Sequence, residues 1–277
     1  MNDTNQNNTV LRFMTCGSVD DGKSTLIGRL LYDTKTILTD TLSQIEKTSK
    51  KKGMSALDLS LITDGLQAER EQGITIDVAY RYFSTGTRKY IIADAPGHEQ
   101  YTRNMVTAAS TAQLAIILVD ARKGMLTQTR RHSYLTKLVG IKHIIVAINK
   151  MDLVDYSEEE YKNICNEYKS FASAIKLEEP NVDIKFVPMS ALNGDMIVDR
   201  GRSLSWYKGP TLLQILEKID TTEKTNSSFL RFPVQFVCRP RDSSNEKLHD
   251  FRAFMGRVES GLMKINDKIK VLPSNHE

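Results

Sequence analysis

The sequence contains few cysteines, no long apolar run and no strong excess of charge. Its 277 residues include three cysteines, Cys16, Cys165 and Cys238, whose spacing fits neither a metal site nor a redox pair, so we expect ordinary thiols. No apolar run approaches the roughly 18 residues that a membrane span needs, so we expect no membrane partner. The formal net charge of +4 is mild for this length and argues against a dedicated nucleic-acid surface.

The amino terminus and the composition favour a cytoplasmic protein with a substantial core. Residues 1–9 are polar and lack the basic and then apolar layout of a signal peptide. A hydrophobic content of 40% over 277 residues is enough for one large domain and part of another.

The most informative segment is a phosphate-binding loop between an apolar run (10–16) and an amphipathic run (25–32). A strand, a tight turn and a helix in this order direct backbone N–H groups and the positive helix end at one point, where a polyphosphate can bind. Lys23 adds a charge for the β- and γ-phosphates, and Ser24 adds a hydroxyl for the accompanying Mg²⁺. The pattern G-x-x-x-x-G-K-[ST] is matched by Gly17-Ser18-Val19-Asp20-Asp21-Gly22-Lys23-Ser24, with Thr25 following. Taken alone, the pattern is also compatible with an ordinary glycine-containing turn.

A second motif, Asp94-Ala95-Pro96-Gly97-His98, ends the apolar run 90–93. It places a carboxylate at the carboxyl end of a strand, where open α/β sheets bind their ligands. We expect Asp94 to hold Mg²⁺ through water, and Gly97 to let its N–H approach the γ-phosphate because it has no Cβ. We assign no catalytic duty to Ala95.

Two further motifs predict that the nucleotide carries guanine. Asn149-Lys150-Met151-Asp152 follows the apolar run 143–148, and Ser190-Ala191-Leu192 follows 184–188. A carboxylate at Asp152 accepts hydrogen bonds from N1–H and the 2-amino group of guanine, whereas adenine presents only a lone pair at N1. Charge-assisted bonds of about 1.5 to 3 kcal/mol each then favour GTP over ATP. The 190–192 backbone is expected near the guanine O6.

Alternating apolar runs and helical periodicity predict an α/β domain over residues 1–222 with a mostly parallel, doubly wound sheet. The predicted strands are 10–16, 76–83, 90–94, 114–120, 143–149 and 184–188. The predicted helices are 25–32, 100–109, 128–139, 158–175 and 211–219, with two more (38–48 and 56–69) in an extended switch region whose Lys50-Lys51-Lys52 tip is solvated.

A polar linker at 221–228 precedes a second region, residues 229–277. Strands are predicted at 232–238, 251–260 and 268–272, as in the start of an antiparallel β-barrel. About 50 residues are few for a closed barrel, so we expect the chain to stop inside this domain.

These motifs resemble the translation-factor class of GTPases, over nearly the whole chain. Within that class the sequence is similar to the GTPase subunits (subunit 1) of bacterial sulfate adenylyltransferase. The similarity is carried by 17–25, 71–83, 98–105, 205–213 and 232–235. Elongation factors usually have His at the position of Asp21, and their sequences differ from this one over 77–83 and 99–103. One departure is Ala95, where relatives more often have Thr or Cys.

The resemblance implies roles for three residues. Thr75 corresponds to the threonine whose hydroxyl reaches Mg²⁺ when the γ-phosphate is present, although its context alone fits a surface strand residue equally well. His98 corresponds to the histidine that positions the attacking water, the alternative being a helix cap or a surface histidine. Asp20 is offered as a ligand of a monovalent cation beside Mg²⁺; the alternative is that it faces solvent or lysines. Together with Lys23 and Gly97, Thr75 and His98 make the predicted catalytic set.

The resemblance also implies a hetero-oligomer with the catalytic subunit of sulfate adenylyltransferase. Joining ATP and sulfate needs an ATP site, and the sequence has no second Gly-rich phosphate loop, no Ser-Gly-Gly loop of the pyrophosphatase type and no His-x-x-His pair. GTP hydrolysis to GDP on this chain would then supply free energy for adenosine 5′-phosphosulfate synthesis on the partner. Two alternatives stay open: a GTP-dependent carrier of aminoacyl-tRNA, and a chain that binds nucleotide without coupling.

Overall fold

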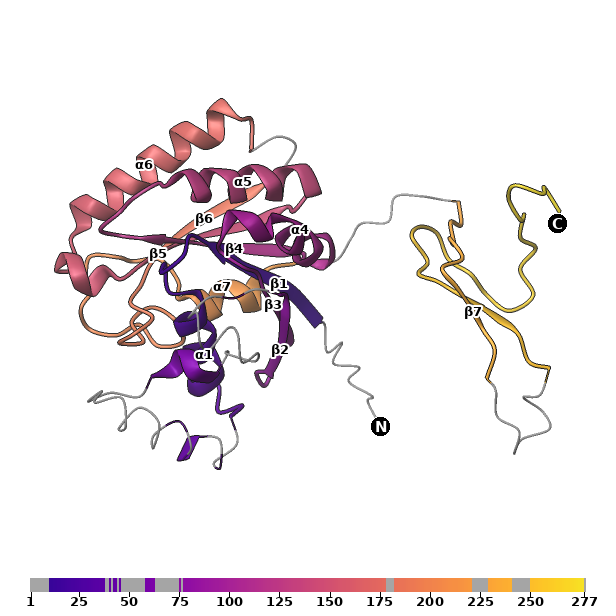
Figure 1. Ribbon diagram of the computed structural model, residues 1–277, viewed down its shortest axis with the longest axis horizontal. Helices are drawn as coiled ribbons and strands as arrows, with labels where there is room; N and C mark the ends of the chain where they lie inside the picture. Colours follow the sequence, from indigo (N-terminus) through magenta and orange to yellow (C-terminus); the bar gives the residue numbers. More distant parts are fainter. Residues whose placement is uncertain are drawn as a thin grey trace. The chain divides into compact units, whose positions relative to one another are not determined.

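Six strands form one mostly parallel sheet in the first of two compact units, Met1–Thr221 and Thr222–Glu277. The computed structural model describes residues 10–37, 40, 42–43, 45, 58–62, 75, 77–177, 182–220, 229–240 and 250–276. The strands are β1 (Val10–Gly17), β2 (Ala79–Ser84), β3 (Lys89–Asp94), β4 (Leu114–Asp120), β5 (His143–Asn149) and β6 (Asp183–Pro188). Their order across the sheet is β2-β3-β1-β4-β5-β6, and β2 alone runs antiparallel to its neighbour (Figure 1).

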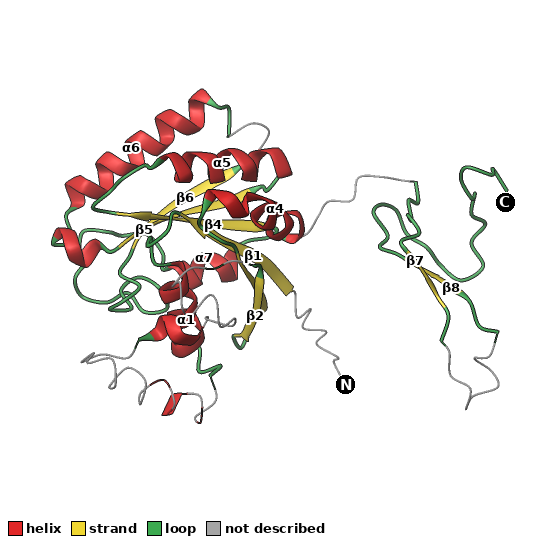
Figure 2. Cartoon of the chain, viewed as in Figure 1, coloured by secondary structure: helices red, strands yellow, loops and turns green. Residues whose placement is uncertain are grey.

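Helices cover both faces of this sheet. They are α1 (Lys23–Asp33), α4 (Thr102–Thr111), α5 (Thr127–Val139), α6 (Glu158–Ala174) and α7 (Leu212–Lys218), with short 3₁₀ turns η1 (Leu59–Ile62), η2 (Glu99–Tyr101) and η3 (Met151–Val154). Figure 2 shows α4, α5 and α6 on one face and α1 and α7 on the other. None of the helices within the described ranges combines the length and the apolar character that crossing a bilayer requires.

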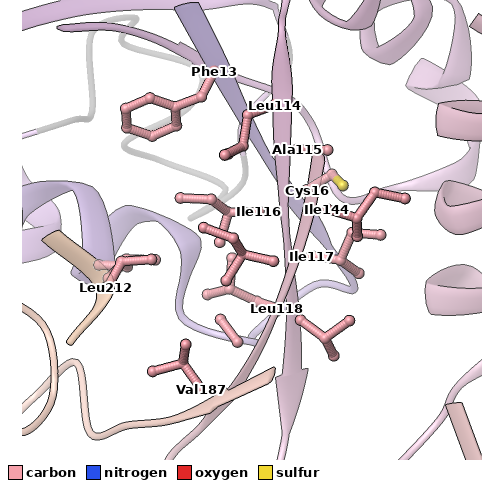
Figure 3. Packing of buried hydrophobic residues seen from close by; sticks show 14 of the residues in the cluster. Phe13, Cys16, Leu114, Ala115, Ile116, Ile117, Leu118, Ile144, Val187 and Leu212 are labelled. Carbon is pink, nitrogen blue, oxygen red and sulfur yellow. The ribbon is translucent and has the colours of Figure 1, made fainter. Parts of the chain in front are cut away.

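The central strands are apolar along their whole length because helices bury both of their faces. Every residue of β4 is buried, and the side chains of Leu114, Ile116 and Ile117 have no exposed surface. They pack with residues of β1, β5 and β6 in the core (Figure 3). Burial of each such side chain stabilises the fold by about 1.5–3 kcal/mol, so the strand ends that carry the polar motifs rest on a rigid base.

The predicted α/β sheet is confirmed, with differences at element ends. β2 begins at Ala79, whereas the sequence predicted residue 76. Ala79 pairs with Asp94, which is the last residue of β3, so the pairing of the two strands ends there. The predicted helix 100–109 is divided into η2 and α4. Most of the segment 38–48, all of 63–69 and the linker 221–228 lie outside the described residues.

The second unit contains a short antiparallel pair, β7 (Phe236–Cys238) and β8 (Ala253–Met255). An isolated bridge joins Arg231 to Ser260. The strand predicted at 268–272 is wrong: within the described part of this unit its only pairing is the bridge between Val271 and His276, and a strand needs a continuous partner. β7 and β8 are also shorter than the strands predicted at 232–238 and 251–260.

Candidate functional site

The carboxyl ends of the parallel strands converge on one cavity of about 560 Å³. β1 ends at Gly17, β3 at Asp94, β4 at Asp120 and β5 at Asn149, and Asp120 pairs in register with Asn149. Open α/β sheets bind ligands at this edge. The lining residues are Val19, Asp20, Gly22, Lys23, Ser24, Thr25, Ser60, Thr75, Gly97, His98, Arg122, Lys123 and Lys150.

The loop after β1 holds its lysine through two backbone carbonyl oxygens. Lys23 Nζ donates to the carbonyls of Gly17 (3.2 Å) and Ser18 (2.7 Å). Burial lowers the pKa of Lys23, while the negative charges of Asp94 and Asp21 act in the opposite direction. Gly22 caps α1 at φ 93°, a left-handed conformation that favours glycine. The loop therefore has the strand, turn and helix geometry that its sequence predicts.

The loop after β3 lies directly against the phosphate loop. A Cβ on Gly97 would lie 2.5 Å from Lys23 Nζ and 2.9 Å from the Gly17 carbonyl oxygen, so only glycine fits here. Asp94 is buried, and its Oδ1 accepts a hydrogen bond from Thr15 Oγ1 at 3.1 Å. Ala95 and Pro96, which the motif predicts to lie at the nucleotide, are buried and do not line the cavity, so their contact with the nucleotide stays a prediction.

Thr75 and His98 line the same cavity as the phosphate loop. Ser24 and Thr75, the two predicted magnesium hydroxyls, are both among its lining residues. His98 is the N-cap of η2, and its Nδ1 accepts the Gln100 N–H at 3.3 Å. Because Nδ1 is the acceptor, the neutral ring carries its proton on Nε2. The capping alternative and the water-positioning prediction are therefore compatible, since each uses a different ring nitrogen.

The predicted base-binding residues form a hydrogen-bonded group beside this cavity. Ser190 Oγ donates to Asp152 Oδ1 at 2.6 Å, which fixes the carboxylate. Asn149 Nδ2 donates to the Asp21 carbonyl (2.8 Å), and the Ala191 N–H donates to Asn149 Oδ1 (2.9 Å). Because this N–H already has a partner, its role at the guanine O6 stays a prediction.

The structure divides the predicted residues into two groups. Of the predicted base-binding residues, Met151 is fully buried and Leu192 is exposed. The predicted residues outside the cavity lining are Gly17, Ser18, Asp21, Asp94, Ala95, Pro96, Asn149, Met151, Asp152, Ser190, Ala191 and Leu192. Of the base-binding motif, Lys150 alone reaches the cavity wall.

Sequence reasoning missed an ion-pair group on the wall formed by the loop after β4. Asp120 accepts hydrogen bonds from Arg122 Nη2 (2.7 Å) and pairs with Lys150 Nζ (3.0 Å). Burial raises the pKa of Asp120, but the hydrogen bonds from Arg122 and Lys150 outweigh it and hold the pKa below its usual range. Lys123 of the same loop and Ser60 of η1 also line the cavity. Asp120 is the last residue of a buried strand, as Asp94 is. A carboxylate at that position in the sequence could therefore have indicated a residue of the site.

Comparison with known proteins identifies the family. Residues 8–225 match the family model of the elongation factor Tu GTP binding domain, so the chain belongs to that family of GTP-binding proteins. The predicted translation-factor class is confirmed. The narrower resemblance to sulfate adenylyltransferase subunits stays a prediction.

Solved structures agree with this assignment. Sup35 in complex with GDP is 27% identical over 96% of this chain and 56% of its own, with a TM-score of 0.57. A bacterial selenocysteine-specific elongation factor is 26% identical over 96% of this chain and 37% of its own, with a TM-score of 0.54. The GTPase-like domain of S. cerevisiae Ski7, bound to GDP and inorganic phosphate, is 24% identical, covers 83% of this chain and 55% of its own, and has a TM-score of 0.64, a likeness of fold. The chain thus spans 37% to 56% of the length of these proteins.

Proposed function

We propose that this chain binds GTP with Mg²⁺ at the carboxyl edge of its parallel sheet and hydrolyses it to GDP and phosphate. The observation that carries the proposal is the hydrogen bond from Asn149 to the Asp21 carbonyl, because it joins the base-binding group to the phosphate loop. The hydrogen-bonded Asp152 then suits the N1–H and 2-amino group of a guanine.

The donor set at the cavity suits magnesium. Mg²⁺ prefers oxygen ligands and usually keeps several waters and the substrate phosphates in its shell. Ser24 and Thr75 supply hydroxyl oxygens at the cavity, and Asp94 is the carboxylate we assign to a water-mediated contact. Among the described residues no three His, Cys, Asp or Glu side chains cluster as a self-sufficient metal site, which fits an ion that arrives with the nucleotide. When bound, this ion neutralises charge on the phosphate oxygens.

His98 is the residue we assign to the attacking water. Its Nδ1 accepts the Gln100 N–H, so Nε2 is the ring nitrogen that we assign to the water. The water oxygen bonds to the γ-phosphorus as the bond from that phosphorus to the β–γ bridging oxygen breaks; GDP leaves with the bridging oxygen, and the protons of the water pass to the phosphate product. Lys23 stabilises the charge that develops on the phosphates.

Equilibrium titration of the full chain with GTP and with ATP, in Mg²⁺, tests the nucleotide assignment. We expect a preference for GTP of at least about 100-fold, from two charge-assisted hydrogen bonds of about 1.5–3 kcal/mol each. Equal affinities for GTP and ATP would refute the assignment.

For the biological role we propose that hydrolysis is coupled to adenosine 5′-phosphosulfate synthesis on a catalytic subunit of sulfate adenylyltransferase. The support is the similarity over 71–83, 98–105 and 205–213. A conformational coupling of this kind must be reciprocal for binding steps. We expect slow hydrolysis by the isolated chain and faster hydrolysis with that subunit present; equal phosphate release with and without it counts against the coupling.

The second candidate is a GTP-dependent carrier of aminoacyl-tRNA. It is favoured by the similarity to a selenocysteine-specific elongation factor. The two candidates use the same nucleotide site and differ in their partners. Binding assays with purified sulfate adenylyltransferase catalytic subunit and with charged tRNA, each in the presence of a non-hydrolysable GTP analogue, separate them.

A monovalent cation near Asp20 is part of the proposal. Asp20 lines the cavity in a left-handed conformation (φ 66°), and its carbonyl oxygen accepts a hydrogen bond from Lys150. We expect faster hydrolysis in potassium than in a bulky organic cation. Identical rates in the two salts would exclude this site.

A further inference from the structure

One tyrosine joins the two loops that carry the base-binding group. The loop after β5 carries Asp152, and the loop after β6 carries Ser190. Tyr156 lies in the first of these loops, just after η3. Its side-chain hydroxyl reaches the second loop, where it accepts a hydrogen bond from Asn193 Nδ2 (3.0 Å) and donates one to Asp195 Oδ2 (2.8 Å). Tyr156 therefore ties the two loops together.

A continuous series of hydrogen bonds leads from this tyrosine to the carboxylate that we assign to guanine. Asn193, whose side chain bonds the Tyr156 hydroxyl, donates its backbone N–H to Ser190 Oγ (3.2 Å). Ser190 Oγ donates in turn to Asp152 Oδ1 (2.6 Å). A serine hydroxyl has one proton to donate, and here that proton is directed at Asp152. The direction of the Asp152 carboxylate therefore depends on where Asn193 is held.

Asp195 anchors the other end of this series. Only 8% of its surface is exposed, and its backbone carbonyl accepts the N–H of Ser190 at 3.2 Å. Gly201 packs directly against the carboxylate, since a Cβ at that glycine would lie 1.9 Å from Asp195 Oδ1. The acceptor of the Tyr156 hydroxyl is therefore a buried group that is joined to the same loop as Ser190.

The backbone of Tyr156 adopts a conformation that is uncommon for a bulky residue. Its φ of 54° and the φ of 50° at Asp155 both lie in the left-handed region. Such conformations persist only where the surrounding structure holds them, and they cluster at functional sites. Trp206 Nε1 donates to the Tyr156 carbonyl oxygen at 2.8 Å. Contacts to the backbone and to the hydroxyl thus hold this residue between the two loops.

We propose that Tyr156, anchored by Asp195, is a positioning residue for base specificity. Its hydroxyl holds the 190–195 segment so that Ser190 keeps Asp152 directed at both the N1–H and the 2-amino group of guanine. This inference rests on the proposed guanine binding. Tyr156 is not among the residues that line the nucleotide cavity, so it acts through Ser190 and Asp152. A carboxylate held in one direction accepts both hydrogen bonds, whereas one that turns loses part of this pair.

Equilibrium binding of GDP and of inosine diphosphate, which lacks the 2-amino group, tests the proposal. Isothermal titration calorimetry on the full chain in Mg²⁺ gives both dissociation constants, and their ratio reports the hydrogen bond to the 2-amino group. We expect the unmodified chain to favour GDP by about tenfold or more, from one charge-assisted hydrogen bond. A general loss of stability changes both affinities in parallel, so this ratio separates a positioning role from a structural one.

Tyr156→Phe removes one oxygen atom and keeps the ring. We expect the preference for GDP over inosine diphosphate to fall by about two- to tenfold, the range of one neutral hydrogen bond. Tyr207→Phe is the matched control, because the Tyr207 hydroxyl donates to the Phe186 carbonyl of β6 (2.9 Å), before the 190–195 segment begins. Tyr207→Phe should keep the preference of the unmodified chain.

Two substitutions at Asp195 give a second test. Asp195→Ala removes the acceptor of the Tyr156 hydroxyl and should lower the preference as Tyr156→Phe does. Asp195→Asn keeps a side-chain oxygen for the same hydrogen bond and should retain the preference. Thermal denaturation checks that each variant is folded; if Asp195→Ala is not, the comparison of Tyr156→Phe with Tyr207→Phe decides.

Three results would overturn the inference. They are an unchanged preference in Tyr156→Phe, an equal fall in Tyr156→Phe and Tyr207→Phe, and an unchanged preference in folded Asp195→Ala. If the unmodified chain binds neither nucleotide, or binds both equally, the proposed guanine site on which the inference rests is refuted instead.

Discussion

Replacing Gly97 by alanine tests whether the loop after β3 lies directly against the phosphate loop. An ideal Cβ at this position lies 2.5 Å from Lys23 Nζ, 2.9 Å from the Gly17 carbonyl oxygen and 3.1 Å from the Ser18 carbonyl carbon. Two of these three neighbours are backbone atoms, and the third belongs to a lysine held by two carbonyls. Rotation of one side chain therefore does not relieve the contact, and the two loops must separate.

Overpacking of this kind typically costs about 1–3 kcal/mol. We expect Gly97→Ala to lower the free energy of unfolding by this amount and to weaken GTP binding, because Lys23 is displaced from its place at the phosphates. If about 2 kcal/mol appears in binding, the affinity falls about 30-fold, at about 1.4 kcal/mol per tenfold. Urea denaturation measures the first quantity, and titration with a fluorescent GTP analogue measures the second.

Gly86→Ala is the matched control for this substitution. Gly86 lies in the turn between β2 and β3, and a Cβ there meets no heavy atom within 4 Å. The free energy of unfolding of Gly86→Ala should stay within about 0.5 kcal/mol of that of the unmodified chain. If Gly97→Ala equals Gly86→Ala in both stability and GTP affinity, the reasoning about the contact between the two loops is wrong.

Three further substitutions test the base, the water and the core. Asp152→Asn should weaken guanine binding and admit xanthosine triphosphate, because Ser190 still orients the new amide; unchanged preference in a competition assay contradicts it. His98→Ala should lower kcat by about 100-fold or more with little change in Kd, whereas His143→Ala, at the amino end of β5, should change neither; equal losses of kcat contradict it. His132→Gln should make the free energy of unfolding depend less on pH under acidic conditions. Burial lowers the pKa of His132 to about 3, so between about pH 6.5 and 3 only the unfolded chain binds this proton, and unfolding becomes easier by about 1.4 kcal/mol per unit of falling pH. Urea denaturation at pH 7 and at pH 5 gives the free energy of unfolding at each pH. If this free energy falls equally between the two pH values in the unmodified chain and in His132→Gln, the prediction is refuted.

The sequence predicted the sheet best where both faces of a strand are buried. The predicted limits 114–120 and 143–149 agree with β4 and β5, because an apolar run buried on both sides ends abruptly at a polar residue. The start of β2 was not predictable in this way, since it depends on where β3 ends. The strand predicted at 268–272 failed for the same reason, because pairing between distant segments is not visible in a local pattern.

The candidate site was predicted to the extent that it is encoded in contiguous motifs. The phosphate loop and the loop after β3 both reach the cavity, and the base-binding residues form one hydrogen-bonded group beside it. Arg122 and Lys123 belong to no motif, so the sequence did not place them at the site. Their place on the cavity wall depends on Asp120, which accepts two hydrogen bonds from the Arg122 guanidinium and one from its backbone N–H, and on the register that sets Asp120 beside Asn149.

Asn149 makes the proposed base recognition and the proposed phosphate binding mechanically dependent on each other. Its amide nitrogen holds the carbonyl of Asp21, and its amide oxygen holds the N–H of Ala191, so one buried side chain spans the phosphate loop and the loop beyond β6. A Cβ on Gly22 would lie 2.5 Å from that same nitrogen, so the phosphate loop lies directly against the Asn149 amide. A displacement of either loop by a few tenths of an ångström must therefore strain the other. We therefore expect the proposed base discrimination at Asp152 and the proposed phosphate binding at Lys23 to be coupled through Asn149, so that their free energies are not additive.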